Sequence, residues 1–409
     1  MMESRSLSGC QVFRPEDIPD EWQCVPLKER LEFAYGQALR EDNRKPGPYD
    51  VYGSNGVVGT HDCYLSDAPG ILIGRKGTVG AVQYASRPFW AIDTVYYIKS
   101  LVNDNFRFLF YLLNYLPLDI LNAATGVPGL SRRDAYALKG VFPPIEEQQA
   151  LAQILDAADT AVERTKEAIE QAYILDHSLL HQLLEKGINT KDSGEGRQPY
   201  HWKTHRVSEV ADVGAGVTLG KDLSGFKTIE LPYLRVANVQ DGYLDLSTIK
   251  AIRVRVDEVD DYRLEPGDVL MTEGGDIDKI GRGTIWEGQI PDCLHQNHIF
   301  RVRVNREILD PYYFSFVVES DIAKRYFFRV AKRTTNLAST NKTQLRAFKF
   351  PVPPLEEQRE IVKVVRASKA KISTLVEKQE ALQQLKKALM HDLLTGKKRV
   401  NVAELASVV

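Results

Sequence analysis

The clearest pattern of apolar and polar positions occurs twice along this chain, in segments that begin at Pro143 and at Pro353. In each segment the inward positions recur in alternating steps of four and three, which is typical of a helix that packs against another helix. The first stripe reads Leu151, Leu155, Ala158, Val162, Thr165, Ile169, Ala172, Asp176, Leu179 and Leu183. The second reads Ile361, Val365, Ser368, Ile372, Leu375, Gln379, Leu382, Lys386, Leu389 and Leu393. We therefore predict two helices of about 40 residues, each about 60 Å long.

The two segments are copies of one unit, related by a constant shift of 210 residues. Between Pro143 and Leu184, thirteen of forty-two positions are identical under that shift. Each copy opens with two prolines, which stop the preceding structure, and continues with two glutamates in the first turn, where the helix dipole favours acids. Internal repetition on this scale predicts a molecule built from two related halves.

The charges of the two helices are complementary. The first, from Pro143 to Gly187, has a net charge of −6, and the second, from Pro353 to Arg399, has a net charge of +5. Because neither helix is stable with its apolar stripe exposed, we expect the two to pack against each other as a coiled coil. The alternative is that each helix covers only its own globular domain.

Short apolar runs bounded by Gly, Asp and Asn precede both helices and predict strands. Trp22 with Gly36 is echoed by Trp202 with Gly216, and Gly77-Thr78-Val79 by Gly283-Thr284-Ile285. The predicted fold is α+β, with two mixed, strand-rich domains related by pseudo-two-fold symmetry and separated by the two helices. The expected domains are 1–142 and 188–352, with helical spacers at 143–187 and 353–409, and a polar linker from Gly187 to Pro199.

Composition is that of a folded protein, with 43 % hydrophobic residues in 409. The first ten residues lack the apolar core of a secretory signal, and no run approaches the roughly 20 apolar residues of a membrane span. We therefore expect a cytoplasmic protein. The four cysteines have no paired spacing, which argues against a disulfide framework or a cysteine zinc site.

Positive charge is concentrated in one window, although the net charge is only −2. From Lys324 to Lys349 there are eight Lys and Arg residues and no acid. Such a cluster suits phosphate, and the interleaved aromatic, Asn and Ser side chains suit base edges. A solvated basic surface is the alternative.

We expect DNA contacts from loop residues of both domains, because Arg, Asn and Gln read bases while Lys and Ser fix the backbone. In the first domain they are Tyr52, Asn55, Arg75, Lys76, Ser131, Arg132 and Arg133. In the second they are Arg235, Asn238, Lys279, Arg282, Lys332, Arg333, Asn336, Asn341 and Lys342.

Catalytic motifs are weak, and we expect no catalytic residue and no metal site. Asp310-Pro311-Tyr312 lacks the second proline of an amino-methyltransferase motif and is interpreted as a helix start. Gly74 to Gly80 lacks the ending of a P-loop. The acids between Glu265 and Lys279 are interpreted as an acidic turn and not as a nuclease site.

Histidines give no stronger signal. His177 and His181 lie one helical turn apart, but the second helix repeats only one of them, as His391. We interpret the pair as a surface or interface feature. His295 and His298 are interpreted as structural or DNA-facing.

The duplicated Pro-Pro-x-Glu-Glu-Gln motif, each time followed by a long helix and His-x-Leu-Leu, resembles the specificity subunit of Type I restriction-modification enzymes. The resemblance covers nearly the whole chain. It implies a non-catalytic subunit that reads a bipartite DNA sequence, one half-site per domain, with two long antiparallel coiled-coil helices as a ruler for the gap.

The same resemblance implies partners and cofactors. Two methyltransferase subunits would dock on the helices and recruit two restriction subunits. S-adenosylmethionine would belong to the methyltransferase, and ATP and Mg to the restriction subunit, so this chain would hold no cofactor. The resemblance places Glu146, Glu147, Gln148, Glu356, Glu357 and Gln358 near the docking partners. The remaining alternatives are a sequence-independent coiled-coil adaptor and a methyltransferase or nuclease in its own right.

Overall fold

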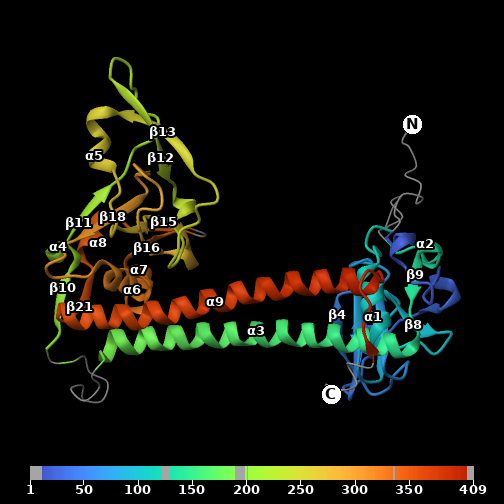
Figure 1. Ribbon diagram of the computed structural model, residues 1–409. Helices are drawn as coiled ribbons and strands as arrows, with labels where there is room; N and C mark the ends of the chain where they lie inside the picture. Colours follow the sequence, from blue (N-terminus) through green and yellow to red (C-terminus); the bar gives the residue numbers. More distant parts are fainter. Residues whose placement is uncertain (1–11, 122–128, 189–198, 200, 335–336, 403–409) are drawn as a thin grey trace. The chain divides into compact units, whose positions relative to one another are not determined.

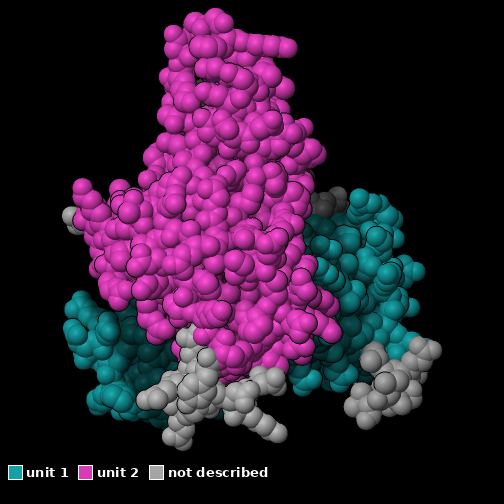
Figure 2. Space-filling model, turned by 90° about the vertical axis from the view of Figure 1, so that its left-hand side faces the viewer, with its two compact units in different colours: residues 1–167, 376–409 teal, residues 168–375 magenta. Residues whose placement is uncertain are grey.

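A computed structural model describes residues 12–121, 129–188, 199, 201–334 and 337–402. It divides into two compact units, shown in different colours in Figure 2. Unit 1 comprises residues 1–167 and 376–409, and unit 2 comprises residues 168–375. Each unit thus takes about half of each long helix, whereas the sequence predicted two domains and two separate helical spacers.

The described residues of unit 1 form three small sheets, labelled in part in Figure 1. Their strand orders are β1-β9, β2-β8-β5-β6 and β4-β3-β7, and only β3 and β7 pair in parallel. The strands are β1 (Gln23–Pro26), β2 (Leu31–Tyr35), β3 (Tyr49–Gly53), β4 (Gly56–His61), β5 (Gly70–Gly74), β6 (Val82–Ala85), β7 (Phe89–Ala91), β8 (Val95–Ser100) and β9 (Lys139–Phe142). Unit 1 also contains two short α-helices, α1 (Phe106–Tyr115) and α2 (Arg132–Ala137), beside its parts of the two long helices.

Unit 2 repeats these three sheets in the same order. The orders are β10-β21, β11-β18-β14-β16 and β13-β12-β17, and β12 and β17 are again the parallel pair. The strands are β10 (Lys203–Arg206), β11 (Ala211–Ala215), β12 (Thr228–Leu234), β13 (Lys250–Arg255), β14 (Val269–Thr272), β16 (Gly283–Ile285), β17 (Leu294–His295), β18 (Ile299–Val304) and β21 (Lys349–Val352). The helices are α4 (Val207–Val210), α5 (Val259–Tyr262), α6 (Pro311–Glu319) and α8 (Lys342–Ala347). The prediction of two related α+β halves is confirmed.

Unit 2 also carries elements for which the described part of unit 1 has no counterpart. They are α7 (Asp321–Val330), β15 (Gly274–Asp276), β19 (Lys332–Arg333) and β20 (Leu337–Ser339). The three strands form a further sheet in the order β15-β20-β19. This addition coincides with most of the basic window found in the sequence.

One glycine of the repeat has the same physical role in both units. A Cβ on Gly36 would lie 2.0 Å from the Ile92 carbonyl oxygen, and a Cβ on Gly216 would lie 1.9 Å from that of His295. Only glycine permits such close backbone approach. The proposed match of Gly77 with Gly283 is wrong. Gly283 pairs with Met271 between β16 and β14, and Val82 pairs with Ile73 between the equivalent strands β6 and β5. The residue of unit 1 equivalent to Gly283 is therefore Val82.

The two long helices are α3 (Ile145–Lys186) and α9 (Leu355–Leu394). Every residue of the two predicted stripes is buried or half-buried. Lys386 pairs with Asp159 in unit 1, and Lys369 pairs with Asp176 in unit 2. From the first pair to the second, the chain advances 17 residues along α3, from Asp159 to Asp176. It goes back 17 residues along α9, from Lys386 to Lys369. The helices are antiparallel in each unit, with one common register.

Each unit's core uses the start of one long helix and the end of the other. In unit 1, Leu151 and Leu155 of α3 and Leu393 of α9 pack with β-strand residues such as Ile71. In unit 2, Ile361 of α9 and Leu184 of α3 do the same. No helix in the described residues is long and apolar enough to cross a membrane.

Candidate nucleic-acid interface

The three predicted loops of unit 1 lie together and form what we call the unit 1 loop surface: residues 54–55, 74–80 and 129–133. Lys76 forms a β-bridge with Gly129, and the Leu130 N–H donates to the Arg75 carbonyl oxygen at 2.8 Å. The loop with Ser54 is also close, because a Cβ added to Gly77 would lie 2.9 Å from the Ser54 hydroxyl oxygen. Loops far apart in the sequence therefore meet on one face.

Two arginines of this surface stack on one aromatic ring. The guanidinium groups of Arg75 and Arg132 lie 5.3 Å and 4.8 Å from the ring centre of Tyr35, which is 49 % exposed. Arg75 also donates to the Asp93 carbonyl oxygen at 2.7 Å and 3.0 Å, which fixes its orientation. Sequence reasoning missed Tyr35. Its position at the end of a strand, directly before Gly36, is the signal that points to it.

The other predicted residues of unit 1 differ in whether their side chains are exposed and free to contact DNA. Asn55, Lys76 and Arg133 are exposed. The Ser131 hydroxyl instead accepts the Asp134 N–H at 3.3 Å and caps α2. Tyr52 is half-buried against Phe89, and burial raises the pKa of its phenol.

The predicted loops of unit 2 also meet, and we call residues 235–240, 273–282, 332–334 and 337–342 the unit 2 loop surface. Arg282 donates to the Gln240 side-chain oxygen at 2.8 Å. Asp276 of β15 pairs with Leu337 of β20. The Thr340 N–H donates to the Glu273 carbonyl oxygen at 2.8 Å, as Leu130 donates to Arg75 in unit 1. Arg75 and Glu273 therefore hold equivalent places with opposite charge.

A groove of about 390 Å³ opens beside this surface, where it meets α7. Four cations, one acid and three apolar side chains line it: Lys279, Arg282, Lys324, Arg325 and Asp241, with Ile277, Ile280 and Phe328. Lys324 pairs with Asp241, and Lys279 pairs with Asp276. Cations beside apolar side chains suit a phosphate backbone with its bases.

The basic window contributes further exposed groups. The Arg333 guanidinium lies 3.8 Å from the ring centre of Phe328 and donates to the Phe328 carbonyl oxygen. Lys332 and Lys342 are exposed. Asn341 accepts the Gln344 N–H at 2.9 Å and caps α8. Asn336 lies outside the described residues.

One predicted DNA contact is wrong. Asn238 is 3 % exposed, and its amide donates to the carbonyl oxygens of Asp245 and Thr248. Its side-chain oxygen accepts the Arg235 N–H at 2.8 Å. Asn238 therefore holds a turn, and Arg235 donates to the Thr248 carbonyl oxygen from beside it. A sequence window cannot separate an amide that closes a turn from one that faces solvent.

The repeated Glu-Glu-Gln motif forms an internal clamp in unit 1. Gln148 accepts the Asn105 N–H at 2.9 Å and donates to Asp104 at 2.8 Å and to the Pro143 carbonyl oxygen at 2.9 Å. Asn105 is the residue that caps α1, so one side chain joins the starts of α1 and α3. Glu147 accepts the Trp22 indole N–H at 2.9 Å and a two-pronged contact from Arg399.

Unit 2 reproduces the clamp. Gln358 accepts the N–H of Asp310, the residue that caps α6, at 2.7 Å. It donates to the carbonyl oxygens of Ile308 and Pro353 at 2.9 Å and 2.7 Å. Glu357 accepts the Trp202 indole N–H at 3.0 Å. The interpretation of Asp310 as a helix start is confirmed.

The clamp corrects the expected docking role of these residues. Glu147, Gln148 and Gln358 are at most 3 % exposed. Glu357 is only half-buried, with 16 % of its side chain exposed. All four side chains are bonded within their own unit. Burial contradicts the docking prediction for Glu147, Gln148 and Gln358, whereas for Glu357 it stays a prediction. Only Glu146 and Glu356 are exposed. The sequence repeats here because both halves need the same clamp.

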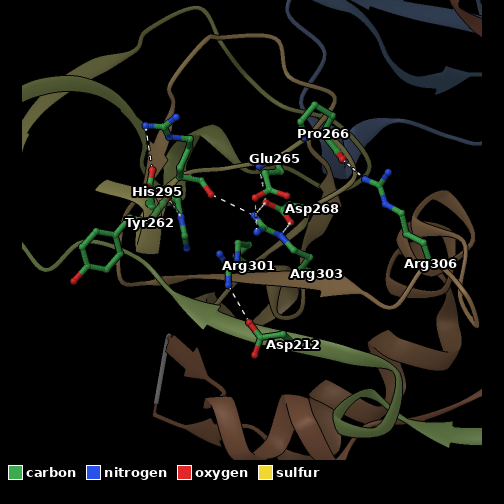
Figure 3. A network of polar contacts seen from close by, with 11 residues as sticks. Asp212, Tyr262, Glu265, Pro266, Asp268, His295, Arg301, Arg303 and Arg306 are labelled. Carbon is green, nitrogen blue, oxygen red and sulfur yellow. Dashed lines mark hydrogen bonds and ion pairs between the residues drawn. The ribbon is translucent and has the colours of Figure 1, made fainter. Parts of the chain in front are cut away.

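A network of polar contacts lies on the unit 2 sheet around the buried Asp268, as Figure 3 shows. Arg303 donates to both oxygens of Asp268 at 2.8 Å, and Arg301 reaches Asp212 at 2.9 Å. Asp268 is 1 % exposed and is paired inside the fold. It also closes the predicted acidic turn before β14, because its N–H donates to the Glu265 carbonyl oxygen at 2.9 Å and its carboxylate accepts the Glu265 N–H at 2.7 Å.

The two histidines of this region have different environments. His295 is fully buried, its Nδ1 lies 3.0 Å from the Tyr262 carbonyl oxygen, and burial lowers its pKa to about 4. His295 is thus structural. His298 is exposed and pairs with Glu273 on the unit 2 loop surface.

His177 and His181 each approach an acid, Asp321 at 3.8 Å and Glu185 at 3.3 Å. Within the described ranges, no three His, Cys, Asp or Glu side chains gather closely enough to hold a metal ion.

Comparison with known proteins identifies the family. The family model described as the Type I restriction modification DNA specificity domain matches residues 19–172 and 199–385. The chain is 23 % identical over 420 residues to the Type I restriction enzyme MjaVIII specificity subunit of Methanocaldococcus jannaschii, covering 94 % of both. A putative MjaX specificity subunit of the same organism is 29 % identical over 214 residues, which is 51 % of this chain and 49 % of that one.

Solved structures share the fold. The crystal structure of a Type I restriction-modification S subunit from M. genitalium has a TM-score of 0.58 at 17 % identity, and covers 91 % of this chain and 96 % of that one. Since the family model matches most of the chain in two successive copies, the protein belongs to the Type I restriction-modification specificity family.

Proposed function

We propose that this chain is the non-catalytic subunit that reads a bipartite DNA sequence for a Type I restriction-modification complex, one half-site per unit. The observation that carries the proposal is the pair of loop surfaces, placed equivalently in two units of the same topology yet lined by different residues. A shared scaffold with unlike loops is what two different half-sites require.

Charge differences at equivalent places support the reading of two different half-sites. Arg75 of unit 1 corresponds to Glu273 of unit 2, and the groove cations Lys324 and Arg325 lie on α7, an element of the unit 2 addition. Arginine reads guanine with two hydrogen bonds, whereas acids accept from cytosine. The basic addition gives unit 2 more phosphate contacts.

The helix pair is proposed as the spacer. α3 and α9 each pass from one unit into the other, and polar pairs within the apolar seam set one register. A buried polar pair is costly to misalign, so it fixes helix register better than apolar side chains do.

Partner docking is proposed for an exposed patch that the two helices repeat. Gln171, Ile174, Leu175 and Ser178 of α3 are exposed and uncharged, and so are the four residues 210 positions later, Ala381, Gln384, Leu385 and Ala388. Leu175 is 67 % exposed and Leu385 is 53 % exposed. Two equivalent patches suit two copies of one methyltransferase subunit, with restriction subunits recruited through it. S-adenosylmethionine, ATP and Mg would then belong to those partners.

Sequencing of adenine methylation tests the proposal. Cells that express the chain with its neighbouring methyltransferase should show methylation at one bipartite motif, and cells without the chain should show none. Equal methylation of all sequences would favour a sequence-independent adaptor, and methylation or cleavage by the purified chain alone would favour an enzyme.

Single arginine variants separate the two kinds of contact. Arg282→Ala removes a groove side chain that Gln240 orients, and it should relax one position of one half-site at a cost of about 1–3 kcal/mol. Arg325→Ala should instead weaken binding to all DNA sequences alike. It should also lower the slope of log affinity against log salt concentration by about 1. Affinities measured across salt concentrations for matched and mismatched duplexes distinguish these results. An unchanged motif and slope in both variants would remove the groove from the interface.

A further inference from the structure

One residue position of the repeat is fixed by its backbone in both units. It directly follows β5 in unit 1, as Arg75, and β14 in unit 2, as Glu273. The Arg75 N–H donates to the Thr94 carbonyl oxygen at 2.8 Å, and the Glu273 N–H donates to the His298 carbonyl oxygen at 2.9 Å. The carbonyl oxygens of Arg75 and Glu273 also accept equivalent bonds on the two loop surfaces. The two side chains therefore start from the same place in each unit.

A different neighbour orients the side chain in each unit. In unit 1 the Arg75 guanidinium lies over the exposed ring of Tyr35. The strand registers put Ala215, which has no ring, in that place in unit 2. There a carboxylate oxygen of Glu273 lies 2.5 Å from the Nδ1 of His298, which must carry the hydrogen because a carboxylate only accepts. His298 thus orients Glu273 as Tyr35 orients Arg75.

The Glu273 carboxylate lies on a surface that otherwise suits DNA phosphates. Its side chain is 32 % exposed and that of His298 is 56 % exposed, so both are open to a ligand. The same surface carries Lys279, Arg282 and Lys332. A carboxylate there repels phosphate, and it favours DNA only if it accepts hydrogen bonds from a base. The amino group of cytosine, exposed in the major groove, is the donor that an acid accepts from.

We propose that Glu273 reads the cytosine of a C·G pair in the half-site of unit 2, and that His298 is the positioning residue that aims its carboxylate. By the same equivalence, Arg75 reads a guanine in the half-site of unit 1. The inference rests on the proposed function, which gives each unit one half-site, and it adds the base and the residues that read it.

A substitution of the same shape tests the base assignment. Glu273→Gln keeps one oxygen and adds an amide N–H, the two groups that bind the N6 and N7 edge of adenine. In cells that express the variant with the neighbouring methyltransferase, methylation sequencing should show one C·G pair of one half-site replaced by A·T or relaxed to both. The purified complex of chain and methyltransferase should lose at least about fivefold of its preference for the parent duplex over the A·T duplex.

Two variants test the positioning residue. His298→Ala removes the group that orients the carboxylate and should relax the same base pair. His298→Asn keeps a side-chain N–H close to the place of Nδ1 and should restore most of the preference for C·G. A histidine with only a structural role would instead change the affinity for all duplexes alike.

Two further variants serve as controls. Glu307→Gln removes an exposed acid of unit 2 outside the loop surface and should leave the motif unchanged. Arg75→Ala should relax a guanine in the other half-site, which also identifies the half-site that each unit reads.

The results separate this inference from the proposed function. If the parent chain directs methylation to no bipartite motif, both fail. The motif may instead be bipartite while Glu273→Gln leaves it unchanged, abolishes methylation at every site, or alters a pair other than C·G. Each of these results would overturn the assignment of Glu273 and leave the proposed function standing. A change in the half-site that Arg75→Ala alters would do the same, and an unchanged motif in His298→Ala would refute the positioning role.

Discussion

At the scale of single residues, the motif that most clearly marks the repeat serves the fold. Gln148 and Gln358 each join two helix starts, and Glu147 and Glu357 each hold a tryptophan indole. A helix N-terminus leaves backbone N–H groups without partners, and a buried glutamine satisfies one of them while its amide satisfies a carbonyl. Identity between the two halves therefore reflects a shared local geometry.

Removal of one clamp glutamine should destabilise the protein. Gln148→Ala leaves the Asn105 N–H and the Pro143 carbonyl oxygen without their partner, which should cost about 2–3 kcal/mol of unfolding free energy. Urea unfolding measures the loss, and Gln358→Ala should behave alike. Gln149→Ala, at an exposed neighbour, is the control and should change stability little. If Gln148→Ala weakened partner assembly with stability intact, a docking role would be restored.

His295 should make stability depend on pH. Burial lowers its folded pKa to about 4 from an ordinary value of 6.5, so the unfolded chain binds this proton at higher pH than the folded chain. Stability should therefore fall as pH drops from 6.5 to 4, by at most about 3 kcal/mol from this group. His295→Asn keeps a donor for the Tyr262 carbonyl and does not titrate. Unfolding curves for both proteins across this range should diverge; parallel curves would contradict the assignment.

At the scale of elements, polar residues in the helix seam decide the register. Asp176 is 7 % exposed and lies 3.6 Å from Lys369, which also binds Glu319 at 2.6 Å. Negative charge on α3 and positive charge on α9 thus meet inside the seam, where solvent screens them least. The predicted complementarity of the helices acts through these pairs.

A double-mutant cycle tests the seam pair. Lys369→Met leaves Asp176 and Glu319 without their cation and should destabilise by about 1–3 kcal/mol, less than for a fully buried pair because Lys369 is 32 % exposed. Adding Asp176→Leu should recover part of that loss, because the uncompensated carboxylate is removed. Lys378→Met, at an exposed position of α9, is the control. Additive effects of the two changes would show that the pair is not coupled.

At the scale of the whole molecule, two copies of one topology are built around shared helices. Each unit's core takes the start of one long helix and the end of the other, so neither half contains all of its own core in one stretch of sequence. Long-range packing of this kind makes the helices part of the folding unit of both halves.

Shortening both helices should change the spacing of the recognised half-sites. Deletion of 164–170 and 375–381, which the common register places opposite each other, removes about 10 Å of helix and rotates the remainder by only about 20°. The unread gap should shrink by about three base pairs, at 3.4 Å per step. Methylation sequencing reads the result. A change within either half-site, with the gap intact, would refute the spacer role.

The sequence by itself determined the repeat, the two long helices, their inward stripes and the α+β class, because periodicity and helix starts are local properties of a chain. It also located the loops that meet on each unit's surface. Only the tertiary structure decided which polar residues face outward. Asn238, Gln148 and Gln358 look like binding residues in sequence and are buried by contacts with segments distant along the chain. The stacking of two arginines on Tyr35 and the groove between α7 and the unit 2 loop surface also arise only in the tertiary structure. Both depend on the packing of distant segments.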